Sequence, residues 1–256
     1  MCFDTDSRPP IPPIAGAAVD GRRVDLIAED GTAVMAFEAR AATPSGAAML
    51  ILPDVRGLHR YYEELTLRFA EAGIDALAID YFARTAATAD RGADFDYQPH
   101  VTELRWPTLL MDVSAGMHQL REGGRTRAGF SVGFCMGGRL SFDLLTRPDL
   151  GMAGAIGFYG WPSGTHRTGT PSPMDSAGEM HGALLALFGG ADQGIPPETV
   201  TAFDDALGAA GVDHEVISYP RAGHSFFDRK HDEFAAESAD AWKRVLEFVA
   251  RLTPPA

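Results

Sequence analysis

The stretch GFSVGFCMGG, residues 129–138, lies between an apolar run and a run with helical periodicity, and it places Cys135 among glycines. Its centre, residues 133–137, reads G-x-C-x-G, the nucleophile-elbow pattern G-x-S-x-G with cysteine in place of serine. An elbow is a strained turn between a strand and a helix, so the residues two positions from the nucleophile must lack side chains. We predict a strand over 126–132 and a helix over 136–147, whose positive end favours a thiolate at Cys135.

Other glycine-rich turns share part of this pattern. Taken alone, the pentapeptide is explained equally well by a turn that holds a buried, inert cysteine. It is not a phosphate-binding loop, because no G-K-[ST] follows the glycines, and the dinucleotide-binding spacing G-x-G-x-x-G is absent. The choice between a nucleophile and an inert cysteine therefore depends on the residues that follow the neighbouring strands.

Strands and helices alternate on both sides of this turn, while the stretches 85–103 and 161–181 are irregular and polar. Strands that alternate with helices of this length predict an α/β fold, with a mostly parallel sheet covered by helices on both faces. We expect strands at 23–28, 32–40, 47–53, 74–80, 126–132, 153–160, 183–190 and 213–220, and helices at 61–73, 104–124, 136–147, 197–211 and 231–252.

The chain shows no internal repeat and no convincing linker, so we expect a flexible, proline-rich tail over 1–17 and a single domain over 18–256. The formal net charge of -13 argues against nucleic-acid and anionic-membrane partners. One of the two cysteines, Cys2, lies in the tail, so no disulfide is expected. Without a signal peptide or an apolar run of about 18 residues, we expect a reduced, cytoplasmic protein.

Candidate partners for Cys135 follow the next predicted strands. Asp192 comes after the strand at 183–190, and His224 comes after the strand at 213–220. Parallel sheets bind ligands beyond the carboxyl ends of their strands. The order nucleophile, acid, histidine is that of α/β-hydrolase triads, in which His224 would take the thiol proton and Asp192 would orient the imidazole. Taken alone, an aspartate such as Asp192 is more often a turn residue, and His224 has the alternative of a surface histidine. The other histidines show no metal-ligand spacing, so we expect neither metal nor cofactor.

At this point the sequence resembles the dienelactone hydrolase family, the carboxymethylenebutenolidases of the α/β-hydrolase fold. The resemblance covers roughly residues 20–250, and it rests on LPDVRGL (52–58), IDYFAR (79–84), GFCMGG (133–138), GFYG (157–160), GGAD (189–192) and AGHSFF (222–227). It implies that Cys135, His224 and Asp192 form the triad. It also implies that the backbone amides of Val55 and Met136 form the oxyanion hole.

The resemblance further implies that Tyr81, Arg84 and Tyr159 face the substrate, with Arg84 paired to the carboxylate that family substrates carry. Here the sequence departs from the family in two places. Asp54 stands where the best-known members have a glutamate that interacts with the resting thiol. Asp228 stands where they have a second carboxylate-binding arginine, and Arg229 follows it as a possible replacement. Arg56 is a further basic candidate, whose alternative is a solvent-facing loop arginine.

The expected activity is a cysteine-dependent hydrolase of small activated esters or lactones, which forms a thioester on Cys135 and needs no cofactor. One alternative is a carboxylesterase or acyltransferase that acts on neutral esters, which Asp228 favours. Another is a binding or redox-sensing protein on a hydrolase scaffold. The sequence indicates no oligomeric state.

Overall fold

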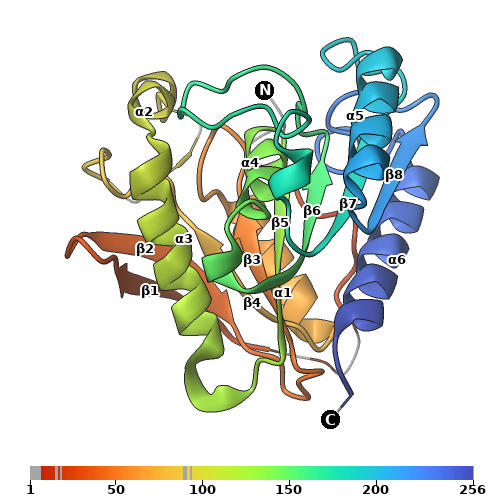
Figure 1. Cartoon of the computed structure of the whole chain (residues 1–256). Helices are drawn as coiled ribbons and strands as arrows, with labels where there is room; N and C mark the ends of the chain where they lie inside the picture. The colour runs from red at the N-terminus through yellow and green to blue at the C-terminus, as the bar shows by residue number, and fades with distance from the viewer. Residues whose placement is uncertain (1–6, 15–16, 18, 89–90, 93, 256) are drawn as a thin grey trace.

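The computed structural model describes residues 7–14, 17, 19–88, 91–92 and 94–255. These form an eight-stranded sheet in the order β1-β2-β4-β3-β5-β6-β7-β8 (Figure 1). β2 is antiparallel to both of its neighbours, β1 and β4, and the six strands from β3 to β8 run parallel to one another. The strands are β1 (Gly21–Ile27), β2 (Ala33–Ala39), β3 (Ala47–Leu52), β4 (Asp75–Ile79), β5 (Ala128–Phe134), β6 (Met152–Phe158), β7 (Ala183–Gly189) and β8 (His214–Tyr219).

Helices cover both faces of this sheet (Figure 1). On one face α1 and α6 pack together, where the rings of Phe69 and Trp242 lie 4.9 Å apart. α3, α4 and α5 lie on the other face. The helices are α1 (Arg60–Glu71), α2 (Gln98–Glu103), α3 (Trp106–Arg121), α4 (Met136–Leu144), α5 (Pro197–Ala210) and α6 (Ala235–Leu252), with 3-10 turns at Glu122–Gly124, Pro148–Leu150 and Ala177–Glu179. The predicted α/β class and mostly parallel sheet are therefore confirmed.

The central strands are buried from end to end. Every residue of β3, β4, β5 and β7 is buried, because helices shield both faces of a parallel sheet from water. This explains why these strands are continuous apolar runs in the sequence. The carboxyl ends of the parallel strands meet at one edge of the sheet, the upper edge in Figure 1, where β6 and β8 point.

Several boundaries differ from the prediction. The stretch 85–103, expected to be irregular, contains α2. This helix has a proline in its first turn, where a backbone amide would have no partner within the helix, so the missing N–H of proline costs nothing there. β5 extends to Phe134, because Phe134 stays in register with Phe158 of β6. α6 begins at Ala235 and not at residue 231, because 226–234 are held in consecutive turns, such as the bond from the His231 amide to the Asp228 carbonyl.

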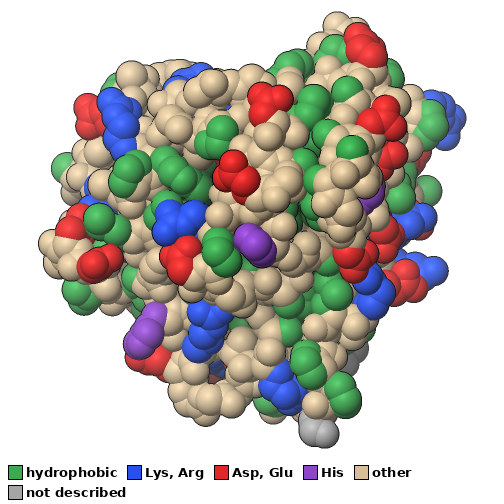
Figure 2. All heavy atoms as spheres, in the orientation of Figure 1, with side chains coloured by type: hydrophobic (Ala, Val, Ile, Leu, Met, Phe, Trp, Pro, Cys, Tyr) green, Lys and Arg blue, Asp and Glu red, His purple; other side chains and the backbone are tan. Residues whose placement is uncertain are grey.

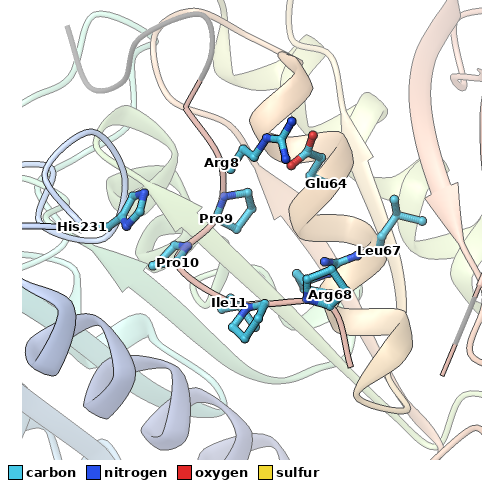
Figure 3. Close-up of a pocket in the computed structure, with 10 residues that line it drawn as sticks. Arg8, Pro9, Pro10, Ile11, Glu64, Leu67, Arg68 and His231 are labelled. Atoms are coloured by element: carbon cyan, nitrogen blue, oxygen red, sulfur yellow. The ribbon is translucent and has the colours of Figure 1, made fainter. Parts of the chain in front are cut away.

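The described part of the N-terminal segment lies along α1. Ile11 is buried, and the amide of Ile14 donates to Glu71 Oε2 over 2.9 Å. An open cavity of about 530 Å³ separates this segment from α1 and from His231 (Figure 3). Cys2 and the rest of residues 1–6 lie outside the described residues.

The surface matches the acidic composition. Figure 2 shows acidic and basic side chains interspersed on one face, with acidic groups gathered over α5. Three acidic residues of α5 are exposed there, Glu198, Asp204 and Asp205. Among the helices that the structure describes, none is long and apolar enough to cross a membrane.

Candidate active site

Cys135 occupies a strained turn between β5 and α4. Its backbone has φ +55° and ψ -113°, a conformation that non-glycine residues rarely adopt. Two backbone bonds hold the turn: the Cys135 amide donates to the Phe158 carbonyl over 3.0 Å, and its carbonyl accepts from the Arg139 amide over 3.1 Å. The side chain is partly exposed at the N-terminus of α4, where the helix dipole stabilises negative charge.

The glycines around Cys135 allow three backbone segments to meet. A Cβ on Gly133 would lie 1.9 Å from the Gly137 carbonyl oxygen, and one on Gly137 would lie 2.1 Å from the Leu52 carbonyl oxygen. A Cβ on Gly138 would approach the Phe158 carbonyl oxygen to 2.5 Å. Since all three obstacles are backbone atoms, none could move aside as a flexible side chain would. The sequence argument that an elbow needs small neighbours agrees with these distances.

His224 and Asp192 are hydrogen-bonded at the same edge of the sheet. His224 follows β8 and Asp192 follows β7, and the His224 Nδ1 and Asp192 Oδ2 atoms are 2.6 Å apart. The Asp192 side chain is only 3% exposed, and its Oδ1 accepts a second bond, from the Gly194 amide. Because a carboxylate only accepts, Nδ1 carries the hydrogen, which leaves Nε2 as the nitrogen that accepts a proton.

Tyr159 connects the histidine to the elbow. It follows β6 with φ +41°, and its ring lies 4.8 Å from the His224 ring and 6.3 Å from the ring of Phe134. Its hydroxyl donates to Asp228 Oδ2 over 2.6 Å. Tyr159 is 1% exposed, and burial raises the pKa of its hydroxyl well above the usual value. It therefore contacts His224 from beneath the surface.

Asp228 lies inside the site and not at its mouth. It is 1% exposed, and besides the Tyr159 hydroxyl it accepts a bond from the Arg229 amide on Oδ1. Burial raises the pKa of its carboxyl to about 8, although these two hydrogen bonds oppose the shift. The Arg229 side chain is exposed, and only its backbone is bound to this group.

The loop after β3 packs against the first turn of α4, which brings Val55 and Met136 to the same edge. The loop is fixed by the Asp54 amide, which donates to the Tyr62 hydroxyl over 3.0 Å, and by the Tyr81 hydroxyl, which donates to the Pro53 carbonyl over 2.7 Å. Asp54 is fully buried, and its Oδ1 accepts from the Arg56 amide. Within the described residues, neither the Val55 nor the Met136 amide donates a hydrogen bond.

Two arginines differ from expectation. Arg56 is 5% exposed, so it is not the solvent-facing loop residue considered as its alternative. Arg84 is bound by two carboxylates of the protein: its guanidinium lies 2.6 Å from Asp112 and 2.6 Å from Asp30. Both ends of its fork are taken by carboxylates of the protein. This differs from the pairing with a substrate carboxylate that the family resemblance implies.

Sequence reasoning missed the hydroxyl of Tyr62, which supports the loop that carries Asp54, and the bond between Tyr159 and Asp228. The two tyrosines are separated from their partners by 8 and 69 residues, and no local pattern indicates such pairs. In the part of the chain that the structure describes, His, Cys, Asp and Glu side chains form no group of three or more suited to a metal ion.

Comparisons with known proteins identify the family and the fold. The family model of the dienelactone hydrolase family matches residues 37–253. A candidate carboxymethylenebutenolidase of Yersinia pestis is 30% identical, over 78% of this chain and 76% of its own length. The carboxymethylenebutenolidase of Rhodococcus opacus is 29% identical, over 98% and 97%. The crystal structure of a candidate dienelactone hydrolase from Klebsiella pneumoniae superposes with a TM-score of 0.80 at 25% identity, covering 91% of this chain and 99% of that one.

Proposed function

The chain belongs to the dienelactone hydrolase family and is a hydrolase of that type, and we propose that it cleaves small activated esters or lactones through a thioester on Cys135. One observation carries this proposal: the φ of +55° at Cys135. An inert, buried cysteine needs no strained backbone, whereas a nucleophile at the tip of an elbow does. The His224–Asp192 hydrogen bond adds a base whose orientation is fixed.

In the first half of the proposed reaction, His224 Nε2 takes the Cys135 thiol proton and the sulfur attacks the substrate carbonyl carbon. The amides of Val55 and Met136 bind the resulting oxyanion. When the intermediate collapses, the ester C–O bond breaks, and the leaving oxygen receives the proton from His224. With an ester, the alcohol or enol is released and the acyl group stays as a thioester on Cys135; with a lactone, the ring opens and the alcohol or enol remains part of the acyl group on Cys135.

Water completes the cycle. His224 takes a proton from water, the hydroxide attacks the thioester carbonyl, and the same two amides bind the second oxyanion. The C–S bond breaks, the thiolate recovers the proton from His224, and the carboxylic acid leaves. Throughout, Asp192 holds the imidazole in one tautomer and stabilises its positive form.

The substrate class follows from the charges around the site. The Rhodococcus relative is named as a carboxymethylenebutenolidase, a name that favours a carboxylate-bearing lactone. In this chain, however, Arg84 is held by Asp112 and Asp30, and buried Asp228 occupies the place of the second arginine. The Arg84 guanidinium is thus held within the protein, and the position of the second arginine carries a carboxyl group, so we propose that uncharged esters and lactones are preferred.

The test compares a neutral aryl acetate with a carboxylate-bearing enol lactone, using the wild type, Cys135→Ala and the matched control Cys2→Ala. We expect Cys135→Ala to lose roughly 10³-fold or more in kcat for both substrates, and Cys2→Ala to lose nothing. We also expect kcat/KM to be higher for the neutral ester than for the lactone. Near-native turnover by Cys135→Ala would refute the nucleophile, and a strong preference for the lactone would refute the substrate class.

A further inference from the structure

A buried tyrosine–carboxyl pair beside the triad has no part in the proposed reaction. Tyr159 and Asp228 are each 1% exposed, and their side chains share a hydrogen bond of 2.6 Å. The Tyr159 ring lies against the His224 ring, with centroids 4.8 Å apart. Through this ring contact, the carboxyl of Asp228 is linked to the proposed general base.

Asp228 has few neighbours that could stabilise a negative charge. Within the described residues, no lysine or arginine side chain forms an ion pair with it. The titratable groups that interact with it come from the loop after β3, from α1, from the residue after β6 and from the loop after β8, and they are Asp54, Tyr61, Tyr159 and His224. Of these, Asp54 opposes ionisation of Asp228, while His224 and the Tyr159 hydroxyl favour it.

We propose that Asp228 is a positioning residue of the triad, which acts on His224 through Tyr159 and whose protonation switches the site between an active and a less active form. The inference rests on the proposed function. In the active form Asp228 is neutral, so Asp192 is the carboxylate that stabilises the imidazolium. In the less active form Asp228 is ionised, and a second buried negative charge faces His224.

The direction of the switch follows from the charges of the reaction. An ionised Asp228 strengthens the hold of His224 on the proton that it must give to the leaving oxygen. The same charge opposes the oxyanion that develops nearby, in a region where burial leaves it poorly screened. Because the pKa of Asp228 is raised to about 8, the active form prevails at neutral pH, and activity is expected to fall as the pH rises through this value.

The experiment measures the pH dependence of kcat/KM for the neutral aryl ester between about pH 5 and 10. The wild type should lose activity with a midpoint near pH 8. In Asp228→Asn, which cannot ionise, this alkaline limb should vanish or move up by at least about one pH unit. In Tyr159→Phe, which keeps the ring but loses the hydroxyl that stabilises the ionised carboxyl, the limb should move to higher pH.

Asp143→Asn is the matched control. Asp143 is a second buried carboxyl, whose pKa burial raises to about 7, but it lies on α4 beside Arg139 and not against His224. The alkaline decline of kcat/KM in Asp143→Asn should superimpose on that of the wild type. If Asp228→Asn does not fold, Tyr159→Phe carries the test. The proposal is overturned if the alkaline decline of kcat/KM has the same midpoint in the wild type and in the Asp228 and Tyr159 variants that fold. It is also overturned if Asp143→Asn shifts this midpoint as far as Asp228→Asn does.

A second readout separates this proposal from the proposed function. The rate at which iodoacetamide alkylates Cys135, followed on its own peptide by mass spectrometry, depends on the thiolate and not on any substrate. Asp228→Asn should change the pH dependence of this rate, and Asp143→Asn should not. Identical profiles in the wild type and Asp228→Asn, with Cys135→Ala inactive, would refute the role of Asp228 and leave the triad intact. An active Cys135→Ala enzyme would refute the proposed function instead.

Discussion

Two regions at the carboxyl ends of the strands are built differently. One is the elbow around Cys135; the other, called the substrate side here, comprises the residues after β4 and β8 that the family resemblance assigns to substrate binding, Arg84 and Asp228. The elbow consists of backbone atoms in contact, and Gly133 and Gly137 are the residues that permit this contact. The substrate side consists of side-chain pairs between distant parts of the chain, such as Arg84 with Asp30 and Asp112. A structure made by backbone contact tolerates no variation, whereas side-chain pairs can be exchanged while the reacting groups stay in place.

This difference explains how the backbone around Cys135 can stay fixed while the charged side chains around it vary. The geometry at Cys135 depends on three segments that meet within van der Waals distance. The arginine that family resemblance assigns to the substrate is instead part of an ion-pair cluster across the first hairpin, the loop after β4 and α3. The two regions should therefore respond in opposite ways to substitution.

The largest effect is expected for Gly137→Ala. The added methyl group would lie 2.1 Å from the Leu52 carbonyl and 2.3 Å from the Pro53 carbonyl, so β3 and α4 must separate. We expect loss of folded protein, or unfolding at a temperature at least about 10 °C lower, since overpacking of this kind costs several kcal/mol. Thermal unfolding measures this effect.

Gly178→Ala is the control, because no atom lies within 4 Å of a Cβ at Gly178 and its φ is not in the left-handed region. A Gly137→Ala protein as stable and active as the control would show that the elbow is not held by backbone contact. The first half of the comparison would then be wrong.

A smaller effect is expected for Arg84→Ala. Removing the guanidinium leaves the Asp112 carboxylate, which is 2% exposed, buried without its partner. Breaking such a pair from one side destabilises a protein by about 3–5 kcal/mol, and partial exposure of Arg84 reduces this to about 2–3 kcal/mol. The ratio of KM values for the acidic lactone and the neutral ester should change less than about twofold, because the proposed function assigns substrate binding to other groups.

Urea unfolding and steady-state kinetics measure the two parts of this prediction. Arg147→Ala, which removes an exposed pair with Asp149, serves as the control and should change stability by less than about 0.5 kcal/mol. A selective rise in KM for the lactone in Arg84→Ala would show that the guanidinium leaves Asp30 and Asp112 to bind substrate. The substrate side would then resemble the family more closely than the structure indicates.

The same contrast explains what could be predicted from the sequence. The strands β3, β4, β5 and β7 are continuous apolar runs because both of their faces are buried. The elbow was predictable because its glycines lie within two or three positions of Cys135. Each of these signals is local, so a single sequence is enough to recognise it.

Other features depend on contacts between distant residues, and the sequence does not reveal them. Arg84 lies 54 residues from Asp30 and 28 from Asp112 in the sequence. No local sequence pattern therefore indicates that these two carboxylates bind its guanidinium. Asp228 was singled out in the sequence as a departure from the family, but only the structure shows that it is buried against Tyr159. The short helix α2 was missed because an amphipathic pattern needs more than six residues to be distinct.

The central claim is that Cys135 carries the acyl group during turnover. The most direct test quenches the enzyme with acid within milliseconds to seconds of mixing with a neutral aryl ester, and measures the intact mass and the modified peptide. We expect an acyl adduct on Cys135 that appears with the first release of phenol, decays as substrate is consumed, and is absent from Cys135→Ala. Steady turnover with no adduct at any time, or an adduct on another residue that persists in Cys135→Ala, would contradict it.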